Sequence, residues 1–246
     1  MAELEALLTE IDGLKARFNA ASPLPSQTLA SLREDWEVLY TYHSNAIEGN
    51  TLTLGETKAI LLDGITISGK PLREHLEAVN HREAMRLMER LATVLKPLEL
   101  DEILELHRTI LTGIQTEDAG SYRSVRIRVA GSMRIFPNPL RVPDLIDAFV
   151  EEVNTLEGHP VVQAARAHYG LVAIHPFIDG NGRTARLLMN LLLLRADYPP
   201  TLLPVEGRAR YYDVLEAANN GDLTPFEVYI AEATLASLAR VLEVVG

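Results

Sequence analysis

The amino-acid sequence predicts an all-α fold, and two observations carry that prediction. Apolar residues recur at three- and four-residue spacing through most of the 246 residues. The run Leu4, Leu7, Leu8, Ile11 and Leu14 is typical, because this spacing places the side chains on one face of a helix. Between such runs lie the glycine and proline combinations that end helices. We therefore expect a helical bundle.

The predicted helices follow one another with short connections. The stretch ASPLPSQ separates the first helix from a second that begins near Leu29. A long helix at about 72–94 follows SGKP, and KPLEL opens the next one. The remaining helices are predicted at about 103–111, 143–156, 160–173, 182–195, 207–219 and 224–244.

One segment breaks the helical spacing. In YRSVRIRVAGSMRIFPNP the apolar residues Val125, Ile127 and Val129 alternate with arginines, and Met133 and Ile135 alternate again beyond Ala-Gly-Ser. Such alternation predicts two short strands joined by a turn, that is, a short β-hairpin. Because a lone hairpin is marginally stable in water, we expect it to lean on the helices.

The sequence offers one domain boundary, near Lys96 and Pro97. We expect an N-terminal helical segment, residues 1–96, followed by a core, residues 97–246, that contains the hairpin and the later helices. A chain of this length can bury a sizeable hydrophobic core.

Composition excludes several classes of function. The net charge of −11 disfavours a nucleic acid as partner. The absence of cysteine excludes disulfides, thiolate metal sites and cysteine nucleophiles. The acidic N-terminal stretch lacks the features of a secretion signal, and the apolar run LLMNLLLL is far shorter than the roughly 20 residues of a membrane span. We expect a cytoplasmic protein without a membrane partner.

The stretch HPFIDGNGRTAR is too polar for core and too ordered for a linker. Asp179, Gly180, Asn181 and Gly182 disfavour the interior of a helix, whereas helical spacing resumes at Leu187, so the run is a loop that opens a helix. The start of a helix offers unpaired backbone N–H groups and a positive dipole end, and glycines let an anion approach them closely. These residues therefore predict a phosphate-binding loop.

Charged residues around the loop complete a chemical site. Arg183 and Arg186, three residues apart, suit phosphate oxygens. Asp179 beside phosphates requires a divalent cation, for which Mg²⁺ is the natural candidate and Mn²⁺ the alternative. His175, with an ordinary pKa of about 6.5, can take a proton from an attacking hydroxyl. The set indicates base-assisted attack on a metal-bound phosphoryl group.

A second motif, SNAIEGN, closes the helix that begins near Leu29. Gly49 suits the position just after a helix, which places Glu48 in the last turn. A carboxylate there meets the negative end of the dipole, at a cost of about 0.3 to 1 kcal/mol, and calls for a cationic partner. Ser44 and Glu48 share one face, and the loop arginines are the obvious partners. The alternative is an ordinary solvated glutamate at a helix end.

The stretch HPFIDGNGRTAR resembles the signature of the Fic (filamentation induced by cAMP) family. The resemblance covers about 98–194 and includes the hairpin, which is similar to the family's flap. Every defined position of the signature is matched, by His175, Phe177, Asp179, Gly180, Asn181, Gly182, Arg183 and Arg186.

This resemblance implies a helical enzyme that transfers AMP from ATP to a hydroxyl side chain of a target protein. His175 would be the general base, Asp179 the Mg²⁺ ligand, and the two arginines the contacts of the distal phosphates. The anion hole would be formed by Gly180, Asn181 and Gly182. The flap residues Val125, Ile127 and Val129 would clamp the target as an added strand. The intact Gly-Asn-Gly-Arg run favours nucleotidyl transfer over phosphorylation.

Two further stretches are similar to family features. RYYDVLEAANNGD resembles the lining of the nucleoside pocket, with Tyr211, Tyr212 and Asn219 at the matching positions, although a core helix with ordinary aromatic packing is the alternative. SNAIEGN resembles the inhibitory motif of the class with an N-terminal inhibitory helix (class II). That likeness implies that Glu48 pairs with Arg186 and keeps the ATP γ-phosphate from its productive place.

Other functions stay open at this point. Glu48 could instead position water to remove AMP from a modified protein, and a scaffold that binds nucleotide without turnover is a third reading. The target protein, with a modified Ser, Thr or Tyr, is not readable from the sequence. Self-modification of Tyr122, Tyr211 or Tyr212 and a homodimer that holds the Glu48 helix are both compatible with it.

Overall fold

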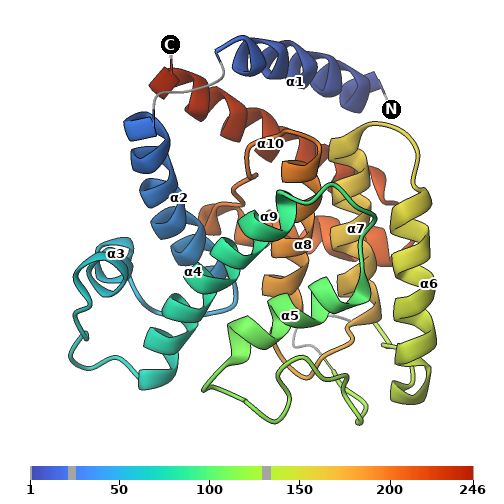
Figure 1. Cartoon of the computed structure of the whole chain (residues 1–246). Coiled ribbons are helices and arrows are strands. Elements are labelled where there is room, and N and C mark those ends of the chain that lie inside the picture. The colour runs from blue at the N-terminus through green and yellow to red at the C-terminus, as the bar shows by residue number, and fades with distance from the viewer. Residues whose placement is uncertain (1, 22–25, 129–133, 246) are drawn as a thin grey trace.

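The computed structural model describes residues 2–21, 26–128 and 134–245, and these residues form ten α-helices and two short 3₁₀ turns (Figure 1). The prediction of an all-α protein is confirmed. In chain order the helices are α1 (Ala2–Ala20), α2 (Ser26–Ile47), α3 (Leu54–Asp63), α4 (Leu72–Ala92), α5 (Leu100–Leu111), α6 (Val142–Thr155), α7 (Pro160–Ile174), α8 (Asn181–Arg195), α9 (Arg208–Asn219) and α10 (Thr224–Val245).

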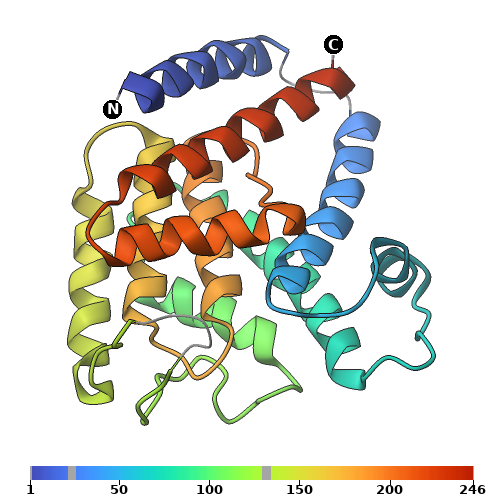
Figure 2. The same ribbon diagram turned by 180° about the vertical axis from the view of Figure 1, so that it is seen from behind.

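Helix α8 lies in the middle of the bundle, and its polar residues Arg183, Arg186 and Asn190 are buried along with its leucines. From Ala185 to Leu191 every residue is buried. A helix buried in this way has partners on all sides. Figure 1 shows α4 and α5 on one side of α7 and α8, and Figure 2, seen from behind, shows α9 and α10 on the other. Helix α1 packs along α10.

Two hydrophobic clusters flank α8. One joins Tyr40 of α2 and Met85 of α4 with Leu106 of α5 and Leu188 of α8. The other joins Ile11 of α1 with α9 and α10. Each cluster contains residues from both sides of Lys96. Within the described ranges, no helix combines the length and the apolar character that crossing a membrane requires.

The sequence prediction missed helix α3. Its signal is a capping box: the Thr53 side chain accepts from the backbone N–H of Glu56, and the Glu56 carboxylate accepts from the N–H of Thr53. Gly64, with φ of 67°, ends the helix in the left-handed region. The pattern Thr-x-x-Glu followed by glycine was therefore enough to place this helix.

The predicted β-hairpin is not found in the described residues, because 121–128 and 134–138 form no strand there. Val129 and the turn of the prediction lie outside the described residues. The physical reason is that the carbonyls near the two ends are bonded otherwise: Val125 O and Pro137 O both accept from the Arg123 guanidinium, at 3.0 and 2.7 Å. Two-stranded pairing is weak by itself, and here a buried side chain holds the ends instead.

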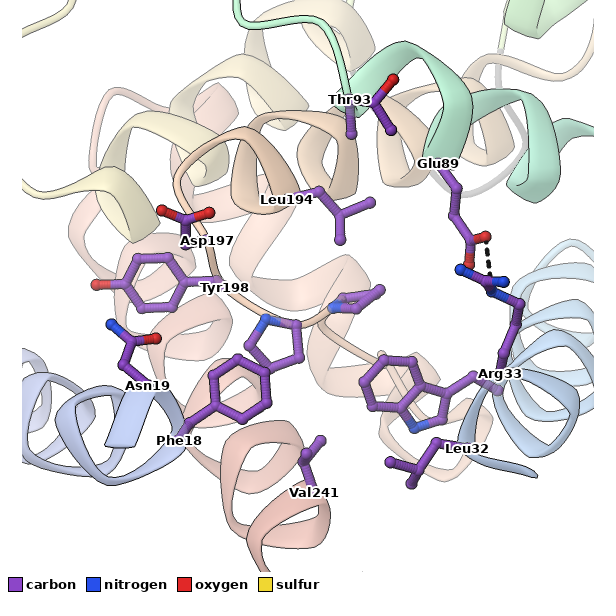
Figure 3. A pocket seen from close by; sticks show the side chains of 14 residues that line it. Phe18, Asn19, Leu32, Arg33, Glu89, Thr93, Leu194, Asp197, Tyr198 and Val241 are labelled. Atoms are coloured by element: carbon purple, nitrogen blue, oxygen red, sulfur yellow. Dashed lines mark ion pairs between the residues drawn. The ribbon is translucent and has the colours of Figure 1, made fainter. Parts of the chain in front are cut away.

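A cavity of about 570 Å³ lies where α1, α2, α4 and α10 meet (Figure 3). Its lining is mainly aromatic and aliphatic, with Phe18 and Val241 pointing into it and the Arg33–Glu89 ion pair at one side. Leu194 in its wall belongs to the C-terminal end of α8. The predicted catalytic residues lie at the other end of that helix.

Candidate active site

The polar loop connects α7 to α8 through a sharp reversal at His175. This residue caps α7 in the left-handed conformation, with φ of 52° and ψ of 61°, and its N–H donates to Leu171 O. Non-glycine residues rarely adopt this conformation, and where they do the strain commonly accompanies function. Pro176 follows and prevents the helix from continuing.

The His175 imidazole is held in one tautomer and is neutral at pH 7. Its Nδ1 lies 3.3 Å from Val172 O, and because a carbonyl only accepts, Nδ1 carries the proton. Nε2 is therefore left with a free lone pair. Burial lowers the pKa of His175 to about 4, against the opposing effect of the bond to Val172 O. The Phe136 ring packs on the imidazole, with centroids 4.6 Å apart. This imidazole can accept a proton at neutral pH.

The side chains of Asn181 and His107 hold the loop in place through contacts with Phe177 and Asp179. The Asn181 side chain accepts from the N–H of Phe177 at 3.0 Å and donates to Phe177 O at 2.9 Å. The His107 ring stacks on Phe177 with centroids 3.6 Å apart. Gly120 N–H donates to His107 Nδ1, so Nε2–H donates to Asp179 O at 3.0 Å. Burial lowers the pKa of His107 to about 4, which keeps this neutral tautomer. The loop shape is thus fixed by buried groups.

The start of α8 presents the predicted anion site. Gly180, with φ of 79°, is the N-cap, and a Cβ there would collide with Ile110. The N–H groups of the first turn, beginning at Asn181, have no carbonyl within their own helix to bond. A Cβ at Gly182 would collide with a carboxylate oxygen of Glu48. Glu48 therefore lies directly against the place where an anionic group would approach.

Arg186 is buried and joins the loop to the SNAIEGN motif. Its Nε donates to Ser44 Oγ at 2.9 Å, and its Nη2 donates to Ser44 O at 2.7 Å and to Glu48 Oε1 at 2.8 Å. Burial by itself would lower the pKa of Arg186, but the Glu48 carboxylate, together with the Tyr211 hydroxyl, raises it. Gly49, with φ of 99°, occupies the predicted position after the helix. Glu48 follows α2 directly.

Asp179 lies in a network of arginines. Arg73 of α4 donates to Asp179 Oδ2 at 2.6 Å and to Glu77 at 3.1 Å. Arg183 lies 3.4 Å from Asp179 and 3.5 Å from Glu77. In the described part of the chain, no three acidic or histidine side chains converge on one point. A single carboxylate used together with substrate phosphates is how Mg²⁺ is commonly held, so Asp179 fits that ion.

A cavity of about 420 Å³ opens beside the loop. Glu48, Gly182 and His175 line it together with all three predicted nucleoside residues, Tyr211, Tyr212 and Asn219.

The three nucleoside candidates are held differently. The Tyr211 hydroxyl lies 3.1 Å from His168 Nε2 in the core. Tyr212 is partly exposed and lies under the Arg208 guanidinium. Asn219 accepts from Arg134 at 2.8 Å. Only Tyr211 is therefore wholly part of the core, and its ring still borders the cavity.

Of the flap candidates, Val125 is exposed and Ile127 is half-buried, so both are near the surface. Sequence reasoning missed three residues of the site, namely Arg73, Glu77 and His107, and it identified Arg123 only as one of a group of arginines. The signal for His107 was its helical spacing from Ile103 and Ile110, which identifies a core-facing residue that is nevertheless polar. Arg73 and Glu77 carried no pattern, because the chain fold alone brings them to the loop.

A helical core with a histidine at the end of one helix and a Gly-Asn-Gly-Arg turn opening the next defines a Fic domain. Residues 97–193 match the Fic/DOC family. The chain belongs to this family.

Among known structures, Fic-1 from C. elegans superimposes with a TM-score of 0.87 at 40% identity, covering 98% of this chain and 72% of that one. A Fic domain containing signaling protein from Bacteroides thetaiotaomicron gives a TM-score of 0.87 at 29% identity, covering 96% of this chain and 97% of that one. Protein adenylyltransferase fic-1 of Caenorhabditis elegans is 41% identical over 95% of this chain. The chain spans 46% of the length of that relative.

Proposed function

We propose that this chain is a protein adenylyltransferase, which transfers AMP from ATP to a hydroxyl side chain of a target protein. The observation that carries the proposal is the neutral His175, which lines the same cavity as Glu48 and Gly182. Relatives named protein adenylyltransferase match nearly the whole chain at about 40% identity.

The proposed reaction assigns one role to each group. The oxygen of the target hydroxyl attacks the α-phosphorus of ATP, and its proton moves to His175 Nε2. The bond from the α-phosphorus to the bridging oxygen breaks, and diphosphate leaves. Backbone N–H groups of Asn181 and Gly182 stabilise the negative oxygens. Asp179 would hold Mg²⁺ or Mn²⁺, which when bound neutralises phosphate charge.

The cavity is proposed to hold the nucleoside between Tyr211, Tyr212 and Asn219, since all three border it together with His175. The segment that contains Val125, Ile127 and Val129 is proposed to bind the backbone of the target. On this side of the cavity Phe136 packs on the catalytic imidazole, which brings the segment close to the reacting atoms.

We further propose that Glu48 inhibits the enzyme. Its carboxylate pairs with Arg186 and lies against Gly182, so it occupies the space that a distal phosphate and its arginine would need. Ser44 holds the same guanidinium through two hydrogen bonds. An anion that replaces Glu48 must therefore break the pair with Arg186.

The test replaces this carboxylate. Glu48→Gly should raise incorporation of label from [α-³²P]ATP and Mg²⁺ by about tenfold, since the loss of about 1.4 kcal/mol of competing interaction corresponds to that factor. Intact-mass measurement should show an added AMP on the labelled protein. Glu157→Gly is the matched control, because Glu157 is an exposed glutamate between α6 and α7. Equal labelling by the wild type and Glu48→Gly would refute the inhibition.

A second activity, hydrolytic removal of AMP from a modified protein, is supported by one observation. Glu48 and His175 line the same cavity, so two proton acceptors face one ligand. The discriminating experiment incubates pre-modified protein with the wild type and with Glu48→Gln. Release of free AMP by the wild type alone would favour hydrolysis, whereas transfer raised in Glu48→Gln without release by either form would favour adenylylation.

A further inference from the structure

Arg123 is a buried cation without a carboxylate partner. Its side chain is among the largest that are almost fully buried, and the residue is 2% exposed. Within the described residues no carboxylate forms an ion pair with it, and burial lowers the pKa of its guanidinium. An arginine is rarely buried this way, because removing its charge from water is costly. The position calls for a specific use of the guanidinium.

All three nitrogens of this guanidinium donate to backbone carbonyls. Nε donates to His175 O at 2.8 Å, Nη1 to Val125 O at 3.0 Å, and Nη2 to Pro137 O at 2.7 Å. The backbone N–H of Arg123 also donates to Pro176 O at 2.9 Å. Arg123 therefore links the turn at His175 and Pro176 to Val125 and to Pro137.

The three carbonyls belong to groups that must be aligned during transfer. His175 is in a left-handed conformation that an L-residue adopts only when its surroundings enforce it, and the bond to its carbonyl is one such restraint. Val125 is the first of the residues proposed to bind the target, and Pro137 follows them in the chain. Phe136, next to Pro137, packs on the His175 ring.

We infer that Arg123 is a positioning residue that holds Val125 and Pro137 at a fixed place relative to the His175 imidazole. This inference rests on the proposed function, since the base and the target-binding residues are assigned there. Arg123 does not line the cavity proposed for the nucleoside, and its guanidinium bonds go to His175, Val125 and Pro137 rather than to α8. Its loss should therefore misalign the attacking hydroxyl and leave ATP binding intact. A displacement of about 1 Å between reacting groups costs on the order of 100-fold in rate.

The experiment compares Arg123→Lys with its parent, Glu48→Gly. Lysine keeps the charge but has one nitrogen, so it can serve only part of the three-carbonyl arrangement. Arg195→Lys is the matched control, because Arg195 is a similarly buried guanidinium at the other end of α8. Three quantities are measured: the rate of label transfer at saturating ATP, the ATP dissociation constant by calorimetry, and the ¹⁵N shifts of the His175 ring, assigned with His175→Ala.

We expect Arg123→Lys to transfer label about 100-fold more slowly than the parent, with an ATP dissociation constant within about threefold. The ring shifts should show that His175 no longer occupies the Nδ1–H tautomer alone. Arg195→Lys should match the parent in all three quantities. If Arg123→Lys does not fold, Arg123→Gln, which is neutral and smaller, replaces it under the same expectations.

Two outcomes would overturn the inference: a parental transfer rate in Arg123→Lys, or equal changes in Arg123→Lys and Arg195→Lys. Failure of the proposed function gives a different result. In that case the parent itself transfers no AMP, while the His175 ring shifts still separate Arg123→Lys from the control and support the positioning role.

Discussion

Helix α8 carries three arginines that pair with carboxylates, and the pairs of Arg186 and Arg195 differ in what surrounds the carboxylate. Arg186, near the start of the helix, lies 2.8 Å from Glu48, and Arg195, at its end, lies 2.6 Å from Glu102. The Glu48 side chain is 34% exposed, whereas the Glu102 side chain is 4% exposed. The distances are alike, so the surroundings of each pair must decide its role.

The two carboxylates also lie at opposite kinds of helix end. Glu102 is in the first turn of α5, where it completes a capping box with Glu99 and meets the positive end of the dipole. Glu48 follows the last turn of α2 and meets the negative end. We therefore expect the pair with Glu102 to be structural and the pair with Glu48 to be the one that a ligand displaces. Exposure and helix polarity distinguish the two roles, and pair geometry does not.

The largest expected effect tests whether AMP transfer takes place at the N-terminal end of α8, where Arg186 contacts Glu48 (the Glu48 end of α8). In the Glu48→Gly background, His175→Ala should lower AMP transfer by about 1,000-fold, because a general base contributes roughly 10² to 10⁴. ATP affinity should stay within about twofold, since the base acts on the target hydroxyl. Label transfer and calorimetry measure the two quantities. His159→Ala, at the other end of α7, is the control; a similar loss there would assign the effect to helix α7 as a whole.

The next effect compares the two glutamates directly. Glu102→Gln leaves the buried Arg195 without a counter-charge, and breaking such a pair costs about 3 to 5 kcal/mol. Glu48→Gln also removes a carboxylate from a buried guanidinium, but Arg186 keeps two hydrogen bonds to Ser44 and the carboxylate is partly exposed, so this variant should be destabilised less. Urea unfolding of both variants measures the difference. Equal destabilisation would contradict the distinction between a structural pair and a displaceable one.

The site divides into a part that the sequence could predict and a part that it could not. The loop from His175 to Arg186 is contiguous, and its glycines, cap and dipole follow from local chemistry, so its form was predictable. That Glu48 needs a cationic partner was also predictable, because a carboxylate at a helix C-terminus calls for a cation. Both conclusions depend on neighbours within a few positions of the chain. That the cation is Arg186, 138 positions away, was implied only by the family resemblance.

The parts that escaped prediction depend on contacts between distant segments. Arg123 appeared to be one of several arginines in an alternating run, and only the fold shows that it holds the ends of that run and thereby replaces strand pairing. His107 resembled any helix residue facing a core until its ring was seen to stack on Phe177. Arg73 lies 106 positions from Asp179. No local pattern reports such contacts.

The pH dependence of AMP transfer tests the protonation of His175 at the Glu48 end of α8. Because the pKa of His175 is about 4, transfer by Glu48→Gly should fall less than about threefold between pH 7.5 and 5.5. A base with the ordinary pKa of about 6.5 would lose about tenfold. Initial rates across this range are the measurement. A midpoint near 6.5 would mean that the imidazole is solvated in the working enzyme.

The lowered pKa of His175 also makes the stability of the folded protein depend on pH. The folded-state pKa of His175 lies below the unfolded value of about 6.5, so the unfolded chain binds more protons between these values. Its contribution to stability is complete above pH 6.5 and is lost as the pH falls towards 4. Burial, aided by the nearby Arg186 charge, lowers the pKa values of His81 and His168 to about 3, and both act in the same direction. Acid should therefore destabilise the Glu48 end of α8 first, which hydrogen exchange at pH 7 and 5 can measure.

The smallest expected effect concerns a third ion pair at this end, between Arg73 and Asp179. The Arg73 guanidinium pairs with the Asp179 carboxylate, which is proposed to hold Mg²⁺. Because the Arg73 side chain is 52% exposed, this ion pair contributes at most about 1 kcal/mol. Arg73→Gln should tighten Mn²⁺ binding by about threefold in the presence of a non-hydrolysable ATP analogue, as measured by electron paramagnetic resonance. Arg90→Gln, at the far end of α4, is the control. Unchanged affinity in Arg73→Gln would mean that Arg73 leaves Asp179 for Glu77 at no cost, since that carboxylate already accepts from the same guanidinium.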